Sequence, residues 1–180
     1  GWHCRQDWSD FAMPGCIWWS DFHVSSLAGS IRSGCISWQD RQENFLPVKH
    51  GEAMTPWEWH APIMQRANQL GMSCFSTPFD DSAVDFLESL DVPCYKIASF
   101  ENTDLPLIRR VAATGKPVLI SSGMSSFADL GEAVSVVRAA KAPVGVFQCT
   151  TAYPCPPERV GLNLIPFYRE RYGCWVGLSD

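Results

Sequence analysis

A lysine, a serine and a glutamate near the end of one short apolar run are the residues of this sequence best suited to chemistry. The run starts at Cys94, Lys96 lies inside it, and Ser99 and Glu101 follow. Because burying a lone ammonium group costs several kcal/mol, Lys96 either pairs with an internal carboxylate, for which Glu101 is a candidate, or binds an anion such as phosphate. In an ideal strand Lys96 projects from the face opposite Ser99 and Glu101, so a shared site requires a bend near Ala98.

Hydroxyl side chains recur where the other apolar runs end. Ser122 and Gly123 separate one such run from a predicted helix, and the backbone N–H groups of a junction of this kind suit a phosphate. Loops of this kind favour Ser and Gly in general, so this pair alone does not identify a site. The other hydroxyl residues at such ends are Thr77, Thr150, Thr151 and Ser179. Their convergence around one lysine is what predicts an anion-binding site.

These residues belong to a repeating pattern of strand-like and helix-like segments. The predicted strands are 73–76, 94–99, 117–121, 143–149 and 174–178, and the predicted helices are 56–70, one capped by Asp80 or Asp81, 104–114, about 126–140, and 163–172. Successive strands start 21 to 31 residues apart, which is the length of a βα unit, so the pattern predicts a βα repeat. Sites in parallel α/β proteins lie at the carboxyl ends of the strands, where Lys96 and the hydroxyls fall.

Local signals support individual helices. Thr55 is predicted to be the N-cap of the first helix and Pro56 its first residue. Leu130, Val134 and Val137 recur at helical spacing and are predicted to form the buried stripe of helix 126–140.

The choice between an open sheet and a closed barrel depends on nucleotide motifs. An open doubly wound sheet usually carries a Gly-rich phosphate loop after its first strand, and neither GxGxxG nor a Walker sequence occurs here. A complete (β/α)8 barrel needs about 250 residues. The predicted fold is therefore α/β, a partial (β/α)8 TIM barrel of about five βα units over residues 55–180.

Residues 1–54 show no sustained period of 2 or 3.6. We expect this stretch to be irregular, with strands conceivable at 17–19 and 35–38. The alternative is that it derives from a misread frame, because it contrasts so sharply with the order that follows.

The composition excludes several classes of protein. The net charge is −5 and Lys and Arg are dispersed, which argues against nucleic acid or an anionic membrane as a partner. No apolar run approaches the roughly 20 residues of a membrane span, and no leader is visible. Four of the eight cysteines, Cys74, Cys94, Cys149 and Cys174, fall in or beside apolar runs, and no cysteine pair has zinc-like spacing, so we expect reduced thiols and a cytoplasmic protein.

From Glu52 to Asp180 the sequence resembles the sialic acid synthase family, and within it the pseudaminic acid type. Six collinear motifs carry the resemblance: TPWEWH at 55–60, FSTPFD at 75–80, YKIASFE at 95–101, SSGM at 121–124, CTTAYP at 149–154 and GLSD at 177–180. The residues Ala98 and Phe100 favour the pseudaminic type, since the sialic and legionaminic types more often have glycines there.

The resemblance implies a TIM-barrel transferase. Such an enzyme condenses phosphoenolpyruvate with an N-acetylated amino sugar, uses a divalent metal (Mn or Mg), gives a nonulosonic acid and phosphate, and forms a homodimer. The positions that the resemblance assigns to phosphoenolpyruvate are Lys96, Thr77, Ser99, Ser122, Gly123 and Ser179. It makes Glu101 an active-site carboxylate and Tyr153 a residue on the sugar side. Thr151 stands where the sialic enzymes have asparagine, so its contact with substrate is an open question.

Other parts of the family pattern are not found in the sequence. The acidic first-strand motif does not occur in residues 1–54, and the metal-binding histidines are expected beyond Asp180. We therefore expect a fragment that is inactive alone, with no metal ligands of its own. The alternatives are another phosphoenolpyruvate-using barrel enzyme, such as an aldolase, and a non-catalytic barrel remnant that binds phosphate or a partner chain.

Overall fold

The computed structural model describes residues 17–18, 56–152 and 155–179. Its strands are β1 (Ile17–Trp18), β2 (Cys74–Phe75), β3 (Tyr95–Ile97), β4 (Val118–Ser121), β5 (Val144–Gln148) and β6 (Trp175–Leu178). Its helices are α3 (Trp57–Gln69), α4 (Asp81–Ser89), α5 (Leu105–Ala112), α6 (Phe127–Ala139), the short 3-10 helix η2 (Pro157–Arg159) and α7 (Leu164–Tyr172). From α3 to β6, every helix and strand predicted from the sequence is present within a few residues of its expected bounds.

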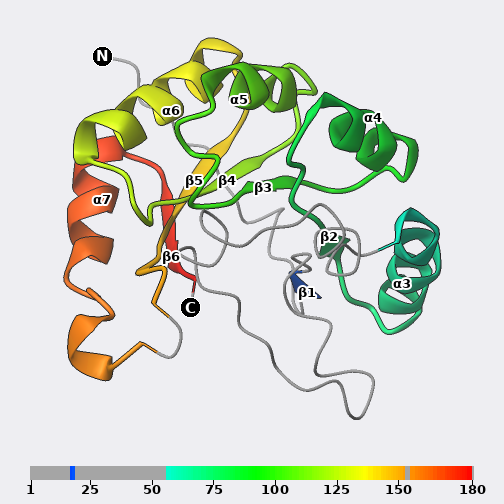
Figure 1. Ribbon diagram of the computed structural model, residues 1–180, viewed down its shortest axis with the longest axis horizontal. Helices are drawn as coiled ribbons and strands as arrows, with labels where there is room; N and C mark the ends of the chain where they lie inside the picture. Colours follow the sequence, from blue (N-terminus) through cyan, green and yellow to red (C-terminus); the bar gives the residue numbers. More distant parts are fainter. Residues whose placement is uncertain (1–16, 19–55, 153–154, 180) are drawn as a thin grey trace, which may run out of the picture.

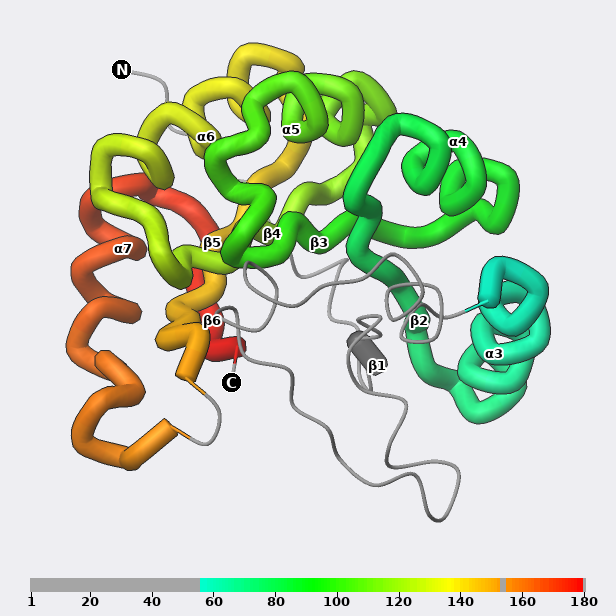
Figure 2. Tube along the Cα trace, viewed as in Figure 1, coloured from blue at the N-terminus to red at the C-terminus, as the bar shows by residue number. Residues whose placement is uncertain are grey.

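The strands are parallel and follow chain order. Strands β3, β4, β5 and β6 form one four-stranded sheet in that order, and β1 pairs with β2 in a separate two-stranded ladder. One backbone hydrogen bond, from the Lys96 N–H to the Ser76 carbonyl at 3.4 Å, connects the end of β2 to β3. Helices α3 to α7 form an arc outside the strands (Figure 1), and the tube in Figure 2 follows successive βα units around this arc. The fold is α/β with a parallel sheet, as predicted.

The main core lies between the sheet and the arc of helices. Alternate strand residues supply it from one side, and the helices supply their apolar stripes from the other. Leu130, Val134 and Val137 of α6 are at most 2% exposed, which confirms the predicted stripe. On the other, inner face of the sheet, a small cluster of Phe75, Cys94 and Leu119 with Phe147 packs separately.

Side-chain caps fix where three of the helices begin. Asp80 accepts a hydrogen bond from the Ala83 N–H, and Asp104 accepts one from the Leu107 N–H. Ser126 and Asp129 form a capping box at the start of α6. At α3 the prediction was wrong by one residue: Pro56 occupies the cap position and the helix begins at Trp57, because the backbone of Pro56 is extended (ψ 136°).

The expectation for residues 1–54 lies outside the described residues, apart from 17–18. There, Ile17 pairs in register with Cys74, and Trp18 with Phe75. The strand suggested at 17–19 is therefore confirmed for these two residues.

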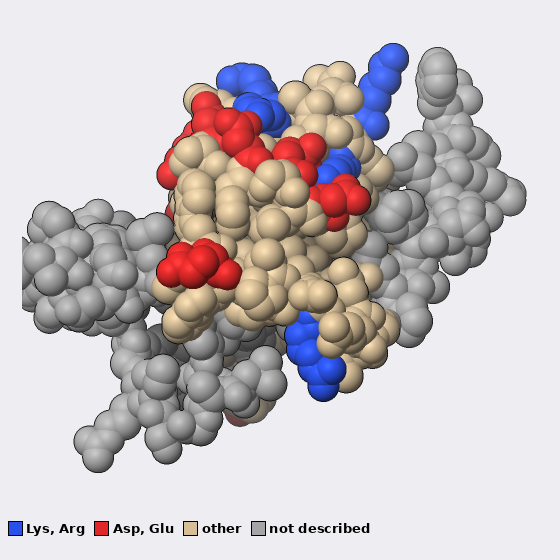
Figure 3. Space-filling view, turned by 90° about the vertical axis from the view of Figure 1, so that its right-hand side faces the viewer, with Lys and Arg blue, Asp and Glu red and all other residues tan. Residues whose placement is uncertain are grey.

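The surface and the helices can be compared with the charge and hydropathy patterns of the sequence. Figure 3 shows acidic and basic side chains interspersed on one face of the molecule. Among the described residues, no helix is both long enough and apolar enough to cross a membrane.

The capping box gives a stability prediction. Replacing Ser126 with Ala removes the acceptor of the Asp129 N–H and should lower the free energy of unfolding by about 1 kcal/mol, measured by urea denaturation. The matched control is Ser135→Ala on the same helix, where the hydroxyl bonds only the Gly131 carbonyl and the change should be near zero or slightly stabilising. Equal losses in the two variants would contradict the capping argument.

Candidate anion-binding site

Lys96 projects from the inner face of the sheet. In the ladder Lys96 pairs with Leu119, and paired residues of neighbouring strands project from the same face. Leu119 belongs to the inner cluster rather than to the main core. Lys96 is only 4% exposed, so its ammonium group is buried on this face.

The Lys96 side chain crosses the inner face to reach the end of β6. Its Nζ lies 3.4 Å from Ser179 Oγ, although β4 and β5 separate β3 from β6 in the sheet. A lysine stem can span three strand spacings only if the sheet curves around it. Two residues predicted for the site, Lys96 and Ser179, are thereby brought together.

The chain turns where the sequence requires a bend. Strand β3 ends at Ile97, residues 99–103 form a turn, and the Glu101 N–H donates to the Ala98 carbonyl at 3.1 Å. The bend near Ala98 is therefore confirmed. It frees Ser99 and Glu101 from the strict alternation that would have kept them on the opposite face.

Burial controls the charge of Lys96. Desolvation lowers the pKa of Lys96 to about 8, and the Cys149 thiol and the Glu101 carboxylate work in the opposite direction by favouring the charged form. Both groups therefore lie close enough to Lys96 to stabilise its charged form. A bound anion would restore the charge further, because it would replace lost hydration.

Three loops meet at Gly123. A Cβ atom on Gly123 would lie 2.4 Å from Thr151 Cγ2 and 2.6 Å from Ser99 Oγ, closer than real Cβ contacts. The loops after β3, β4 and β5 can thus touch only because this residue is glycine. Of the residues predicted for the site, the structure brings Ser99, Gly123 and Thr151 into one contact.

Two buried hydroxyls face this region without a hydrogen bond to any described residue. They are Thr77 Oγ1 and Ser121 Oγ, in residues 3% and 1% exposed. Alternation from Phe75 and Leu119 of the inner cluster places Thr77 and Ser121 on the face that carries Lys96. A buried hydroxyl without a partner is costly, so each is a natural donor for a ligand.

Sequence reasoning named Thr77 but missed Ser121. It chose the neighbouring Ser122, whose register instead places it beside Gln148 on the outer face. The ladder register was needed to separate these two serines. The predicted contact of Ser122 with substrate stays a prediction.

Asn102 is a second residue that sequence reasoning missed. Its Nδ2 lies 2.9 Å from the Ser121 carbonyl, 3.1 Å from the Gly123 carbonyl and 3.0 Å from Ser125 Oγ, and the residue is 1% exposed. Asn102 therefore fixes the loop after β4 against the turn after β3. An asparagine next to a predicted helix start reads from sequence as a cap, which conceals this role.

Thr151 adopts a backbone conformation that suits few residues. Its φ is +55°, in the left-handed region that β-branched residues avoid, and its hydroxyl donates to the Thr150 carbonyl at 2.6 Å. Such strain concentrates at functional sites. Tyr153, predicted on the sugar side, lies outside the described residues.

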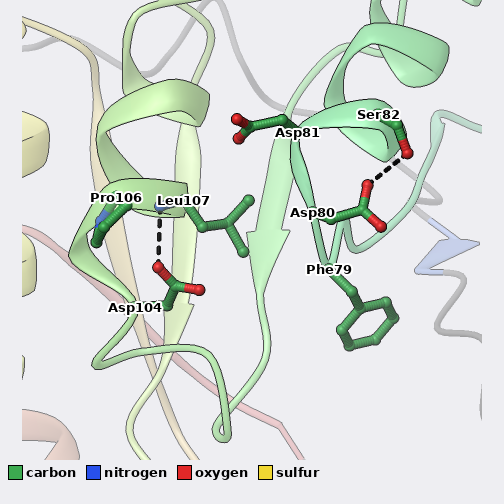
Figure 4. Close-up of a pocket in the computed structure, with 7 residues that line it drawn as sticks. All are labelled: Phe79, Asp80, Asp81, Ser82, Asp104, Pro106 and Leu107. Carbon is green, nitrogen blue, oxygen red and sulfur yellow. Dashed lines mark hydrogen bonds between the residues drawn. The ribbon is translucent and has the colours of Figure 1, made fainter.

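A separate surface pocket lies near the starts of α4 and α5 (Figure 4). Its lining residues are Phe79, Asp80, Asp81, Ser82, Asp104, Pro106 and Leu107. Figure 4 shows Asp104 bonded to the Leu107 N–H and Asp80 bonded to the Ser82 hydroxyl, and the pocket contains no basic side chain. Its negative charge makes it unsuitable for a phosphate. Among the described residues, no group of three His, Cys, Asp or Glu side chains could hold a metal ion.

Comparison with known proteins agrees with the fold. The model of the NeuB family matches residues 37–180. Pseudaminic acid synthase of Helicobacter pylori is 41% identical over 140 residues, which cover 77% of this chain and 41% of that protein. Human N-acetylneuraminate-9-phosphate synthase is 32% identical over 110 residues, 61% of this chain and 31% of that protein. The chain thus spans about two fifths or less of the length of these relatives.

Solved structures show the same arrangement. The spore coat polysaccharide biosynthesis protein SpsE of Bacillus subtilis matches with a TM-score of 0.68 and 29% identity, over 76% of this chain and 39% of that one. The N-acetylneuraminic acid synthetase of Leptospira borgpetersenii, solved with citrate, has a TM-score of 0.71 over 78% of this chain and 50% of that one. At 24% identity the second likeness shows the fold alone.

The buried ammonium group predicts how stability depends on pH. The folded pKa of Lys96, about 8, lies below the ordinary value of 10.5, so the unfolded chain binds more protons between these values. Stability from this group therefore rises as the pH rises through that window. Lys96→Met should be more stable than the parent chain by up to roughly 3 kcal/mol below pH 8, and the gap should close toward pH 10 in urea titrations. A gap that does not change with pH would refute the assignment.

Backbone strain at Thr151 predicts a stabilising substitution. Asparagine tolerates φ > 0 far better than threonine, so Thr151→Asn should raise the free energy of unfolding by about 1 kcal/mol. The control is Thr150→Asn, one residue earlier, where φ is not positive and no gain is expected. Calorimetric melting of the two variants measures the difference, and a loss of stability in Thr151→Asn would show that the threonine methyl contact outweighs the strain.

Proposed function

The chain belongs to the NeuB family, and on this basis we propose that it forms the phosphate-binding part of a nonulosonic acid synthase. The reaction joins phosphoenolpyruvate to an N-acetylated amino sugar and releases phosphate. The 41% identity to a pseudaminic acid synthase supports a sugar of that type. Since the chain spans only part of its relatives' length, the activity belongs to the proposal for the whole protein.

The proposed architecture is a partial (β/α)8 barrel. Residues 55–180 would form an incomplete synthase domain of about five βα units, with residues 1–54 left unassigned. Parallel strands in chain order and helices on one side support this arrangement. The curvature required by the contact between Lys96 and Ser179 supports it as well.

One observation carries the proposal: a buried ammonium group lies on the inner face, the face that also carries two buried hydroxyls without a hydrogen bond to any described residue. Lys96 would bind the phosphate or carboxylate of phosphoenolpyruvate, with Thr77 and Ser121 as donors beside it. The loops after β3, β4 and β6 would complete this binding site with Ser99, Gly123 and Ser179. Together these residues would form an anion cradle. Cation and hydroxyls together match the dense negative charge of this substrate.

The chemistry follows from charge development on the substrate. C3 of the enol attacks the aldehyde carbon of the sugar and forms the new C–C bond, while C2 becomes electron-poor and adds water. The resulting tetrahedral centre then loses phosphate to leave a ketone. Lys96 and the hydroxyls would stabilise the phosphate until it leaves. Glu101 would be the active-site carboxylate, and Tyr153 would lie on the sugar side. Thr151 would line the cradle at its contact with Gly123.

A divalent metal, Mn or Mg, is what the family resemblance implies for polarising the sugar aldehyde. The described residues do not fit such an ion, since no three potential ligands come together. We therefore assign the described residues to the phosphoenolpyruvate side, while Tyr153, which lies outside them, keeps its proposed place on the sugar side. A homodimer and a cytoplasmic location are further expectations for the whole protein.

Binding tests the proposal directly. The 180-residue chain should bind phosphoenolpyruvate in a calorimetric titration, and Lys96→Met should weaken binding about 10- to 100-fold, because a charge-assisted contact is worth about 1.5 to 3 kcal/mol. Lys141→Met, the same change at an exposed lysine, should bind like the parent.

Two outcomes would contradict this assignment. The first is a parent chain that does not bind phosphoenolpyruvate, and the second is a Lys96→Met variant that binds it as well as the parent. With manganese and candidate amino sugars added, no phosphate release is expected from this chain alone. Sugar-dependent release would show that the chain is more than the phosphate-binding part.

A further inference from the structure

Gln148 is a buried residue at the end of β5 that no sequence motif marks as functional. It is 4% exposed and lies on the outer face, because Val144 and Val146 of the same strand belong to the main core while Phe147 belongs to the inner cluster. Gln148 therefore lies behind the site, separated from Lys96 by the sheet.

The Gln148 amide connects two neighbouring segments. Its Nε2 donates to the Val160 carbonyl at 3.1 Å, and its Oε1 lies 3.3 Å from Ser122 Oγ. The Cys149 N–H donates to the same Ser122 oxygen at 3.3 Å. A Cβ on Gly161 would lie 2.9 Å from Gln148 Nε2, so the segment packs tightly against the amide.

Donor and acceptor chemistry fixes the direction of each hydrogen bond in the series that links Val160, Gln148, Ser122 and Cys149. The Val160 carbonyl only accepts, so the amide NH₂ must face it and Oε1 must face Ser122. Oε1 only accepts, so the Ser122 hydroxyl must donate to it and can accept from Cys149. Because the Ser122 N–H also donates to the Phe147 carbonyl, Ser122 uses both of its donors within the protein.

We propose that Gln148 is a positioning residue that acts through Ser122. It fastens residues 149 and 160, the two ends of the loop after β5, to the end of β4, and so holds Thr151 against Gly123 in the anion cradle. The effect on ligand binding rests on the proposed function. The tether, meaning the hydrogen bonds of Gln148 and Ser122 that fasten residues 149 and 160, does not rest on it. Ser122 would then shape the site without contacting the ligand.

The test separates the tether from ligand binding. Gln148→Met keeps the length of the side chain but cannot hydrogen-bond, so amide exchange at Cys149 should become about tenfold faster and phosphoenolpyruvate affinity should fall about tenfold. Gln65→Met, on the exposed side of α3, is the control and should change neither. In the Gln148→Met background, Ser122→Ala should add little, because the two residues act as one unit.

Gln148→Glu supplies a readout that a purely structural role would not give. A protonated glutamate can donate to Val160 and accept from Ser122, whereas a carboxylate cannot donate. The Cys149 exchange rate and the phosphoenolpyruvate affinity of Gln148→Glu are each compared with those of the parent at the same pH. They should match the parent near pH 5 and match Gln148→Met near pH 8. Among the described residues, the hydrogen-bond partners of the amide are the Ser122 hydroxyl and the Val160 carbonyl, neither of which titrates, and the nearby Glu158 and Arg159 are exposed.

Each result decides one question. A Cys149 exchange rate in Gln148→Met equal to that of the parent would overturn the tether. A Gln148→Glu variant whose Cys149 exchange rate, relative to the parent, does not change with pH would overturn it as well. Faster exchange with unchanged phosphoenolpyruvate affinity would overturn the positioning role. If the parent chain does not bind phosphoenolpyruvate, the proposed function fails, while the exchange data still decide the tether.

Discussion

The burial of one ammonium group on the inner face of a parallel sheet is the constraint on which the site depends. Lys96 loses its hydration there, while a serine hydroxyl lies 3.4 Å from its ammonium group and Glu101 and Cys149 favour its charged form. Such a group is retained at a cost in stability, so an anionic ligand is the simplest reason for keeping it. The curvature of the sheet follows from the same contact, because Lys96 must reach β6 across two strands.

The two faces of the sheet divide structure from function. On the outer face, alternate residues of β3 to β6 pack against helices α4 to α7 and supply most of the buried apolar area. On the inner face the cluster is small, and polar groups take over toward the carboxyl ends of the strands. Ser121 and Ser122 show how sharp this division is, since adjacent serines project to opposite sides and have opposite hydrogen-bond environments.

A feature could be predicted from the sequence when the residues that form it lie close together along the chain. Helices and strands were predictable because caps such as Asp80 and stripes such as that of α6 act within a few residues. The bend after Ile97 was predictable because alternation demanded it. Asn102 and Gln148 were not, because their partners lie 12 to 26 residues away and are matched only once the strands are in register. Ser121 was missed for the same reason: register, rather than residue type, decides which serine faces the lysine.

If the proposed function holds, anion binding and turnover are separable properties of this chain. The lysine, the two hydroxyls that form no hydrogen bond to a described residue, and the tethered loop come from consecutive βα units whose cores are formed by local packing. The groups expected to activate the sugar are not among the described residues. A cradle assembled from adjacent loops needs only those loops and their strands to be correctly placed, whereas catalysis also needs a second substrate held against it. The phosphate side can therefore be understood from its own contacts, before the rest of the reaction is known.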